Sequence, residues 1–190
     1  MSESVCTLVS ALKSSTAWFG GVDLMGGGQN LGLRSGTENT PYIIGMGKAA
    51  EELGKSHPGE TYGKIMRAFS DRVKENLAWA KPVFNCKSDE TGLPNTVSVG
   101  FSGVENLTAG EIVRKCCEKN LIIAAGSACD SGKSCKSLSY SSVLKNSGVG
   151  LAVGVSTLRV SCGFWNTQED GLRAADILAD VVTEINDAKS

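Results

Sequence analysis

Residues 95–101 have the sequence Asn-Thr-Val-Ser-Val-Gly-Phe, in which apolar residues alternate with small or polar ones. Period-two alternation is typical of a strand with one buried face. The residues that share this face are Val97, Val99 and Phe101. Residues 156–162, Ser-Thr-Leu-Arg-Val-Ser-Cys, alternate in the same way and predict a second half-buried strand. The apolar run 121–125 predicts a third strand, buried on both faces. The sequence therefore predicts a small sheet.

Four other segments place apolar residues at helical spacing, and they begin near Pro41, Tyr62, Thr108 and Thr167. The last two carry an acidic residue three positions later, which is the spacing of an N-terminal helix cap. In the closing helix the residues predicted to face inward are Leu172, Ala175, Leu178, Ala179, Val182 and Ile185. These elements predict an α/β protein of the α+β kind, with helices packed on a small, mostly antiparallel sheet.

Composition excludes several classes of protein. The chain has 190 residues and a formal net charge of −1, so it has no excess of cations to neutralise the phosphates of a nucleic acid. No apolar run approaches the roughly 20 residues that cross a bilayer. The stretch Ser2-Glu3-Ser4 lacks the basic residues that lead a signal peptide. Seven cysteines, two of them adjacent, indicate reduced thiols, and we expect a cytoplasmic protein.

Common nucleotide and metal motifs are not matched. Residues 45–50 fit a loose G-x-G-x-x-A pattern but lie inside a helical stripe with no strand before it. Residues 126–134, GSACDSGKS, have five residues between the glycines where a P-loop has four. The closest candidate metal-ligand spacing, Cys129 and Cys135, is not repeated, so we expect no metal site.

Cys129 differs from the other cysteines in its surroundings. It follows the small residues 126–128 in a polar loop, with Lys133 and Lys136 close in sequence. An accessible thiol in a positive field is readily ionised and nucleophilic, so Cys129 is a candidate reactive cysteine; the alternative is an inert loop cysteine. The remaining cysteines of the helix and strand patterns are predicted to pack in the core: Cys6, Cys86, Cys116, Cys117 and Cys162.

Two further segments can hold an anion. Arg159 lies in a strand of small and apolar residues, on the face opposite Leu158 and Val160, where an arginine can bind a carboxylate or phosphate through two parallel hydrogen bonds. The alternative is a structural ion pair with an internal acidic residue. Residues 26–41 combine glycines, hydroxyls and Arg34 just ahead of a helix, which fits either an anion cradle or a glycine-rich connector.

Together these segments resemble the C-terminal part of the selenocysteine lyase and cysteine desulfurase family, which is class V aminotransferase-like. The matching stretches are GGGQNLGLRSGTENTPYIIGMGKAAEEL (26–53), LPNTVSVGF (93–101), AAGSACDSG (124–132), SSVLKNSGV (141–149) and STLRVSCGFWNTQED (156–170). The sequence of residues 36–53 is most similar to the selenocysteine lyase branch.

The resemblance implies a homodimeric enzyme of fold-type I that uses pyridoxal 5′-phosphate to take selenium or sulfur from L-selenocysteine or L-cysteine and leave L-alanine. It implies that Cys129 accepts the selenium or sulfur and that Arg159 binds the substrate carboxylate. It implies that Thr37 reaches the cofactor phosphate of the partner subunit. An acceptor protein for the selenium or sulfur is a further implied partner.

The family's Ser-x-His-Lys motif, which holds the cofactor, does not occur in the sequence: His57 has no lysine after it, and Lys13 is the only lysine before the glycines. We therefore expect residues 1–25 to be a divergent leader and residues 26–190 to be the small domain without the large, lysine-bearing one. On this view the chain alone has no turnover.

Three alternatives to a selenocysteine lyase remain open at this point. One is a cysteine desulfurase for sulfur mobilisation. Another is a non-catalytic protein that dimerises with a full-length relative or carries the chalcogen on Cys129. The third is a redox protein that uses Cys129 and Cys135.

Overall fold

The computed structural model describes residues 26–30, 34–56, 59–85, 92–126 and 141–189. Its contacts divide the chain into two compact units, residues 1–55 and residues 56–190, which we treat separately. Cys129 and Cys135 fall outside the described residues, as do Cys6, Cys86 and the predicted leader, residues 1–25.

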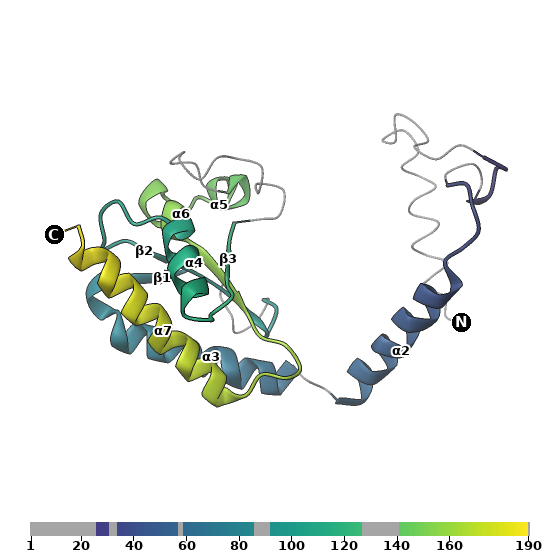
Figure 1. Cartoon of the computed structure of the whole chain (residues 1–190), viewed down its shortest axis with the longest axis horizontal. Coiled ribbons are helices and arrows are strands. Elements are labelled where there is room, and N and C mark those ends of the chain that lie inside the picture. Colours follow the sequence, from purple (N-terminus) through teal and green to yellow (C-terminus); the bar gives the residue numbers. More distant parts are fainter. Residues whose placement is uncertain (1–25, 31–33, 57–58, 86–91, 127–140, 190) are drawn as a thin grey trace. The chain divides into compact units, whose positions relative to one another are not determined.

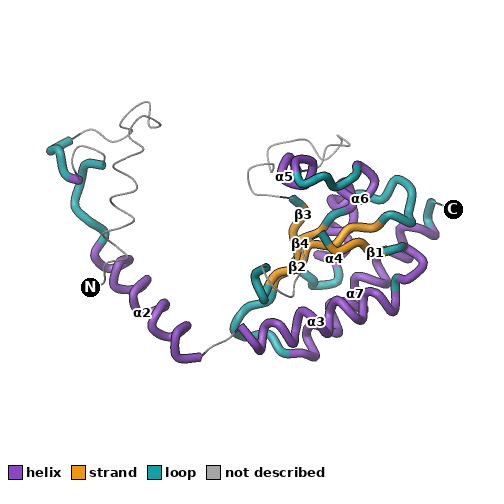
Figure 2. The backbone as a smooth tube through the Cα atoms, turned by 180° about the vertical axis from the view of Figure 1, so that it is seen from behind, coloured by secondary structure: helices purple, strands orange, loops and turns teal. Residues whose placement is uncertain are grey.

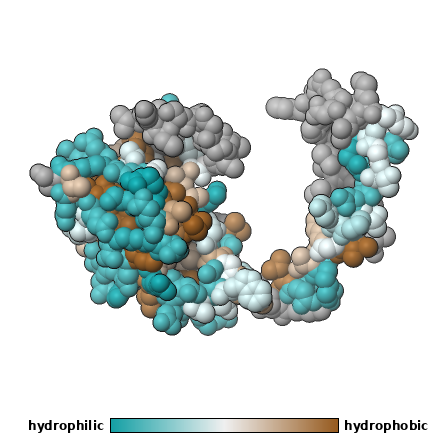
Figure 3. Space-filling view, viewed as in Figure 1, coloured by the Kyte–Doolittle hydropathy of each residue, from teal (hydrophilic) through white to brown (hydrophobic). Residues whose placement is uncertain are grey.

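The first unit contains helix α2 (Thr40–Ser56) (Figure 1). Pro41 occupies the first turn, where its missing N–H is not needed. Gly45 and Gly47 lie inside this helix, which agrees with the rejection of a dinucleotide motif there. Its large apolar side chains are exposed, and brown, hydrophobic atoms lie at the surface over this helix in Figure 3. The exposed side chains are Tyr42, Ile43, Ile44, Met46 and Leu53.

The second unit is built on a four-stranded antiparallel sheet in the order β1-β2-β4-β3. The strands are β1 (Pro82–Phe84), β2 (Thr96–Phe101), β3 (Ala124–Ala125) and β4 (Leu158–Ser161). Val99 pairs with Phe84 on one side and with Leu158 on the other. The predicted strands 95–101 and 156–162 are thus the two central strands, and the predicted fold class is confirmed.

Helices α3 (Gly59–Asn76) and α7 (Gln168–Asp187) lie side by side against one face of this sheet (Figures 1 and 2). The apolar face of β2 and β4 packs on them, and the buried residues with the largest side chains are Phe69, Leu77, Phe101, Ile112, Leu158, Leu178 and Ile185. Asp176 joins the two helices, because its Oδ1 accepts hydrogen bonds from Arg72 Nε and Asn76 Nδ2, both at 2.8 Å.

Helix caps follow the predicted spacing. Thr167 begins α7 in a full capping box, in which its Oγ1 accepts from Asp170 N–H and its own N–H donates to Asp170 Oδ2. Thr108 begins α4 (Ala109–Glu118) and accepts from Glu111 N–H at 3.3 Å. The Glu111 carboxylate binds Lys189 Nζ at 2.6 Å instead of closing a second box.

The opposite face of the sheet is partly covered by α6 (Leu151–Ser156), which follows α5 (Ser142–Asn146) (Figure 2). A short 3₁₀ turn, η2 (Ala78–Ala80), joins α3 to β1. The Val153 carbonyl of α6 lies 2.6 Å from where a side chain on Gly100 would begin, so only glycine fits at this position of β2. Among the described residues no helix has the length and apolarity needed to span a bilayer.

Three predictions about this unit are wrong. The run 121–125 is not a buried strand: only Ala124 and Ala125 pair, at the edge of the sheet, and Ile122 is 78% exposed. The reason is the end of α4. Asn120 takes a left-handed conformation (φ 62°) and the Leu121 N–H donates to the Cys116 carbonyl, so this segment closes the helix in a Schellman motif.

The other errors concern helix faces. Cys116 is buried but Cys117 is exposed, since adjacent helical residues point about 100° apart. On α7, Leu172 was predicted to face inward but is exposed. Val181 was not predicted to face inward but is buried.

Candidate functional site

Arg159 lies on the central strand β4, on the sheet face opposite the one that packs on α3 and α7. In the register of β4, its Cα partners are Ser98 on β2 and Ala124 on β3. Its neighbours Leu158 and Val160 are buried on the other face, as predicted, and Arg159 itself is exposed. The alternation of β4 therefore presents the guanidinium on the face away from α3 and α7.

Arg159 has no acidic partner among the residues that the structure describes. Other arginines do: Arg34 pairs with Glu38 at 2.6 Å and Arg72 with Asp176 at 2.8 Å. The alternative explanation of Arg159 as a structural ion pair therefore finds no support in these residues. An arginine that is fixed on a sheet and not neutralised is suited to a carboxylate or phosphate ligand.

Polar side chains surround this arginine along the same face. Asn85 follows β1, and its Nδ2 donates to Ser98 Oγ at 3.3 Å and to Thr157 Oγ1 at 3.1 Å. Thr157 in turn donates to the Val153 carbonyl at 2.8 Å. Sequence analysis missed Asn85 and Ser98, although Ser98 alternates with Val97 and Val99 and so had to share a face with Arg159 if the two strands paired.

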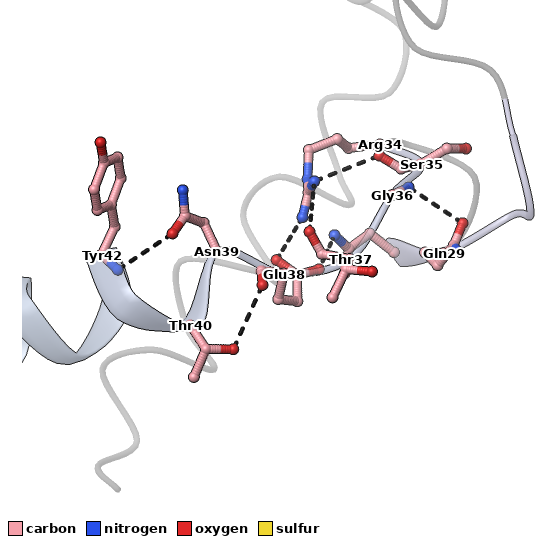
Figure 4. A network of polar contacts seen from close by, with 10 residues as sticks. Gln29, Arg34, Ser35, Gly36, Thr37, Glu38, Asn39, Thr40 and Tyr42 are labelled. Carbon is pink, nitrogen blue, oxygen red and sulfur yellow. Dashed lines mark hydrogen bonds and ion pairs between the residues drawn. The ribbon is translucent and has the colours of Figure 1, made fainter.

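In the first unit, the segment before α2 is organised around Glu38 (Figure 4). Its carboxylate accepts from Asn30 Nδ2 and from Arg34 Nη2, both at 2.6 Å. These hydrogen bonds, first that from Asn30 and then that from Arg34, hold the pKa of Glu38 below its usual value. Arg34 is therefore neutralised, and its charge is not free for a phosphate.

The first turn of α2 is not an open anion site either. Thr40 N–H donates to the Glu38 carbonyl at 2.8 Å. Tyr42 N–H donates to Asn39 Oδ1 at 3.3 Å (Figure 4). Pro41 has no N–H to offer. The predicted cradle thus differs from a helix N-terminus that binds an anion through its backbone.

What this segment does present is the hydroxyl of Thr37. Thr37 is exposed, and within the described residues its hydroxyl makes no hydrogen bond, whereas its carbonyl accepts weakly from Arg34 Nη1 at 3.5 Å. The preceding Gly36 has φ +97°, a conformation that side chains rarely adopt. The Thr37 hydroxyl can therefore donate one hydrogen bond to a phosphate oxygen.

Two of the three described cysteines, Cys116 and Cys162, are poor nucleophiles. Cys116 and Cys162 are buried, and desolvation raises the pKa of both thiols, that of Cys116 to about 11. A buried thiol with a raised pKa stays protonated at neutral pH. Cys162 borders a pocket of about 450 Å³ in the second unit, whose wall includes Phe69, Ile123 and Arg173.

The comparisons with known proteins agree with this fold. A family model described as "Aminotransferase class-V" matches residues 20–172. The chain belongs to the aminotransferase class-V family. The sequence resemblance to its cysteine desulfurases and selenocysteine lyases is thereby confirmed, and this group of enzymes depends on pyridoxal phosphate.

Among class-V relatives, the chain is 36% identical over 162 residues to "Cysteine desulfurase IscS 1" of Archaeoglobus fulgidus, covering 85% of this chain and 40% of the relative. It is 34% identical over 152 residues to "Selenocysteine lyase" of Bos taurus, covering 77% of this chain and 33% of that protein. The chain therefore spans about two fifths or less of the length of these curated relatives.

Solved structures give the same fold. A "NIFS-LIKE PROTEIN" superposes with a TM-score of 0.63 at 22% identity and covers 85% of this chain and 38% of its own. A NifS-like protein from Rickettsia africae superposes with a TM-score of 0.58 at 26% identity, over 88% of this chain and 40% of its own. The roles of Cys129, Arg159 and Thr37 remain predictions.

Proposed function

We propose that this chain supplies the substrate-binding and chalcogen-accepting residues of an enzyme that removes selenium or sulfur from L-selenocysteine or L-cysteine and leaves L-alanine. The observation that carries the proposal is Arg159, an exposed arginine on a central strand with no acidic partner in the described residues. The planar guanidinium matches a carboxylate with two parallel N–H···O bonds. That contact orients an amino acid by the group that cysteine and selenocysteine share.

Pyridoxal phosphate, when bound, supplies an electron sink that makes the chemistry at the amino acid's carbons possible. Toward this cofactor the chain offers the Thr37 hydroxyl, which is free to donate to a phosphate oxygen. The Ser-x-His-Lys motif that holds the cofactor in the family is not present in these residues. We therefore expect the 190-residue chain to show no turnover and no absorbance from a lysine-linked cofactor.

Cys129 is the proposed acceptor. Its thiolate attacks the sulfur or selenium of the bound substrate, and a new sulfur–sulfur or sulfur–selenium bond forms. The bond from carbon to the chalcogen breaks with its electron pair on carbon, and a proton added there completes alanine. Cys129 is left with the transferred atom, which an acceptor protein can collect.

A dimer is part of the proposal, because Thr37 would serve the cofactor of the partner subunit. The exposed apolar residues of α2, among them Tyr42, Ile44 and Met46, support a partner of some kind, since such a row is costly to leave in water. The partner is either a second copy or a full-length relative.

A chimera tests the proposal. Residues 26–190 replace the corresponding part of the Archaeoglobus fulgidus relative, and the cofactor absorbance confirms that the product folds and loads. We expect alanine formation from L-cysteine or L-selenocysteine. Arg159→Ala is expected to raise KM about 10-fold or more, because it removes a charged two-point contact. Arg173→Ala, at an exposed arginine on α7, is the matched control and should leave KM unchanged.

Cys129→Ala in the same chimera should abolish chalcogen release while the cofactor stays bound. A loaded chimera that turns over equally well without Cys129 would contradict the acceptor role. A loaded chimera with no activity would favour the non-catalytic alternative. The ratio of kcat/KM for the two amino acids decides between selenium and sulfur.

A further inference from the structure

Four hydroxyls of the described residues share the sheet face of Arg159: Thr96, Ser98, Thr157 and Ser161. Thr157 Oγ1 accepts from Asn85 and donates to the Val153 carbonyl. Its single proton is therefore used inside the protein. A hydroxyl has one proton to donate, so the partners of each hydroxyl show whether its proton has an acceptor within the described residues.

Thr96 and Ser161 are hydrogen-bonded to each other. Their oxygens lie 3.1 Å apart across β2 and β4, and either hydroxyl can be the donor. Thr96 Oγ1 also has an acceptor in Asn95 Oδ1 at 3.4 Å. Both hydroxyls therefore have a hydroxyl partner within the sheet.

Ser98 is different. Its oxygen accepts from Asn85 Nδ2 at 3.3 Å, and within the described part of the chain its own proton reaches no acceptor. The Asn85 amide occupies one lone pair of the Ser98 oxygen. Ser98 is half-buried and is the Cα partner of Arg159 on the next strand.

We propose that Ser98 is a second substrate-binding residue, whose hydroxyl donates to the carboxylate held by Arg159. This inference rests on the proposed function and adds to it. A carboxylate has about four lone-pair sites, of which the guanidinium fills two. Directly opposite on the other side of Arg159, Ala124 has only a methyl group, so the extra donor comes from β2 alone.

The test is a titration of the 190-residue chain with L-alanine, followed by the NMR signals of the arginine Nε–H groups and the backbone amides. L-alaninamide, which has no carboxylate, is the matched ligand and should not bind. We expect Ser98→Ala to raise the Kd for L-alanine about 5-fold, the effect of one hydrogen bond to a charged group on an accessible surface. Ser98→Thr keeps the hydroxyl and should restore binding.

Ser161→Ala is the matched control, because it makes the same substitution on the same face but removes a hydroxyl that is hydrogen-bonded to Thr96 across the two strands. It should leave the Kd unchanged. If Arg159→Ala abolishes binding while Ser98→Ala binds like the wild type, the Ser98 role is overturned and the proposed function stands. If the wild type binds L-alanine equally without Arg159, both are overturned. If the wild type does not bind L-alanine, the Ser98 role is overturned and the proposed function stands, because that function also needs the cofactor. Unchanged amide spectra of the variants show that each one folds.

Discussion

At the scale of single residues, Cys116 and Cys117 show how one helix separates chemically identical neighbours. Cys116 is fully buried against α7 and its pKa is raised to about 11, whereas Cys117 is exposed. Below pH 9 the Cys116 thiol is neutral in both the folded and the unfolded chain. Between about pH 9 and 11 only the unfolded chain ionises, so the free energy of unfolding falls as the pH rises.

We predict that this residue contributes about 2 to 3 kcal/mol to that fall, since each pKa unit corresponds to about 1.4 kcal/mol. Urea denaturation of the wild type and Cys116→Ala from pH 7 to 11 measures it. The variant should lose less stability over this range, whereas Cys117→Ala should follow the wild type. Equal slopes for the wild type and Cys116→Ala would show that the thiol is not desolvated.

The alternation of residues predicted which face of the sheet Arg159 occupies, but it did not predict the hydrogen bonds of the residues beside it, Ser98 and Asn85. Alternation in β4 is a local property and fixes the face directly. Within the described residues, Arg159 has no acidic partner and the Ser98 proton has no acceptor, and both facts depend on which strand lies beside which. That order joins residues more than 60 positions apart, and neither strand's own sequence specifies it.

At the scale of elements, Gly100 decides how closely α6 approaches β2. A Cβ at this position would lie 2.6 Å from both the Val153 carbonyl and Thr157 Oγ1. We predict that Gly100→Ala lowers the free energy of unfolding by about 1 to 3 kcal/mol, because the backbone of α6 must move. Denaturation in urea measures the change.

Gly110 in α4 is the control for this substitution, since a Cβ there meets open space. Gly110→Ala should raise the free energy of unfolding by up to about 1 kcal/mol, because alanine favours the helix. A Gly100→Ala variant as stable as Gly110→Ala would mean that α6 does not pack on β2 in solution.

Elements whose signals are local were predictable. The caps at Thr108 and Thr167 depend on neighbouring residues, and the structure confirms them. The structure of residues 121–125 was not predictable, because an apolar run fits a buried strand as well as it fits the segment that closes a helix. Its first N–H was already committed to closing α4, a bond that hydrophobicity does not reveal.

At the scale of the whole molecule, the sequence predicted helices on an antiparallel sheet but not the pairing of α3 with α7. These helices are about 100 residues apart, and their contact is fixed by Arg72, Asn76 and Asp176. Thr37 lies in the first unit and Arg159 in the second, and only the family resemblance assigns both residues to one enzyme.

The most direct test of the central claim is to locate the transferred atom. The cofactor-loaded chimera is given L-selenocysteine without a reductant, and its cysteine peptides are analysed by mass spectrometry. The account predicts selenium on Cys129, reduced in Arg159→Ala at the same substrate concentration, below KM, and retained in Arg173→Ala. Selenium on Cys117 or Cys162 in place of Cys129, or transfer unaffected by the loss of Arg159, would contradict it.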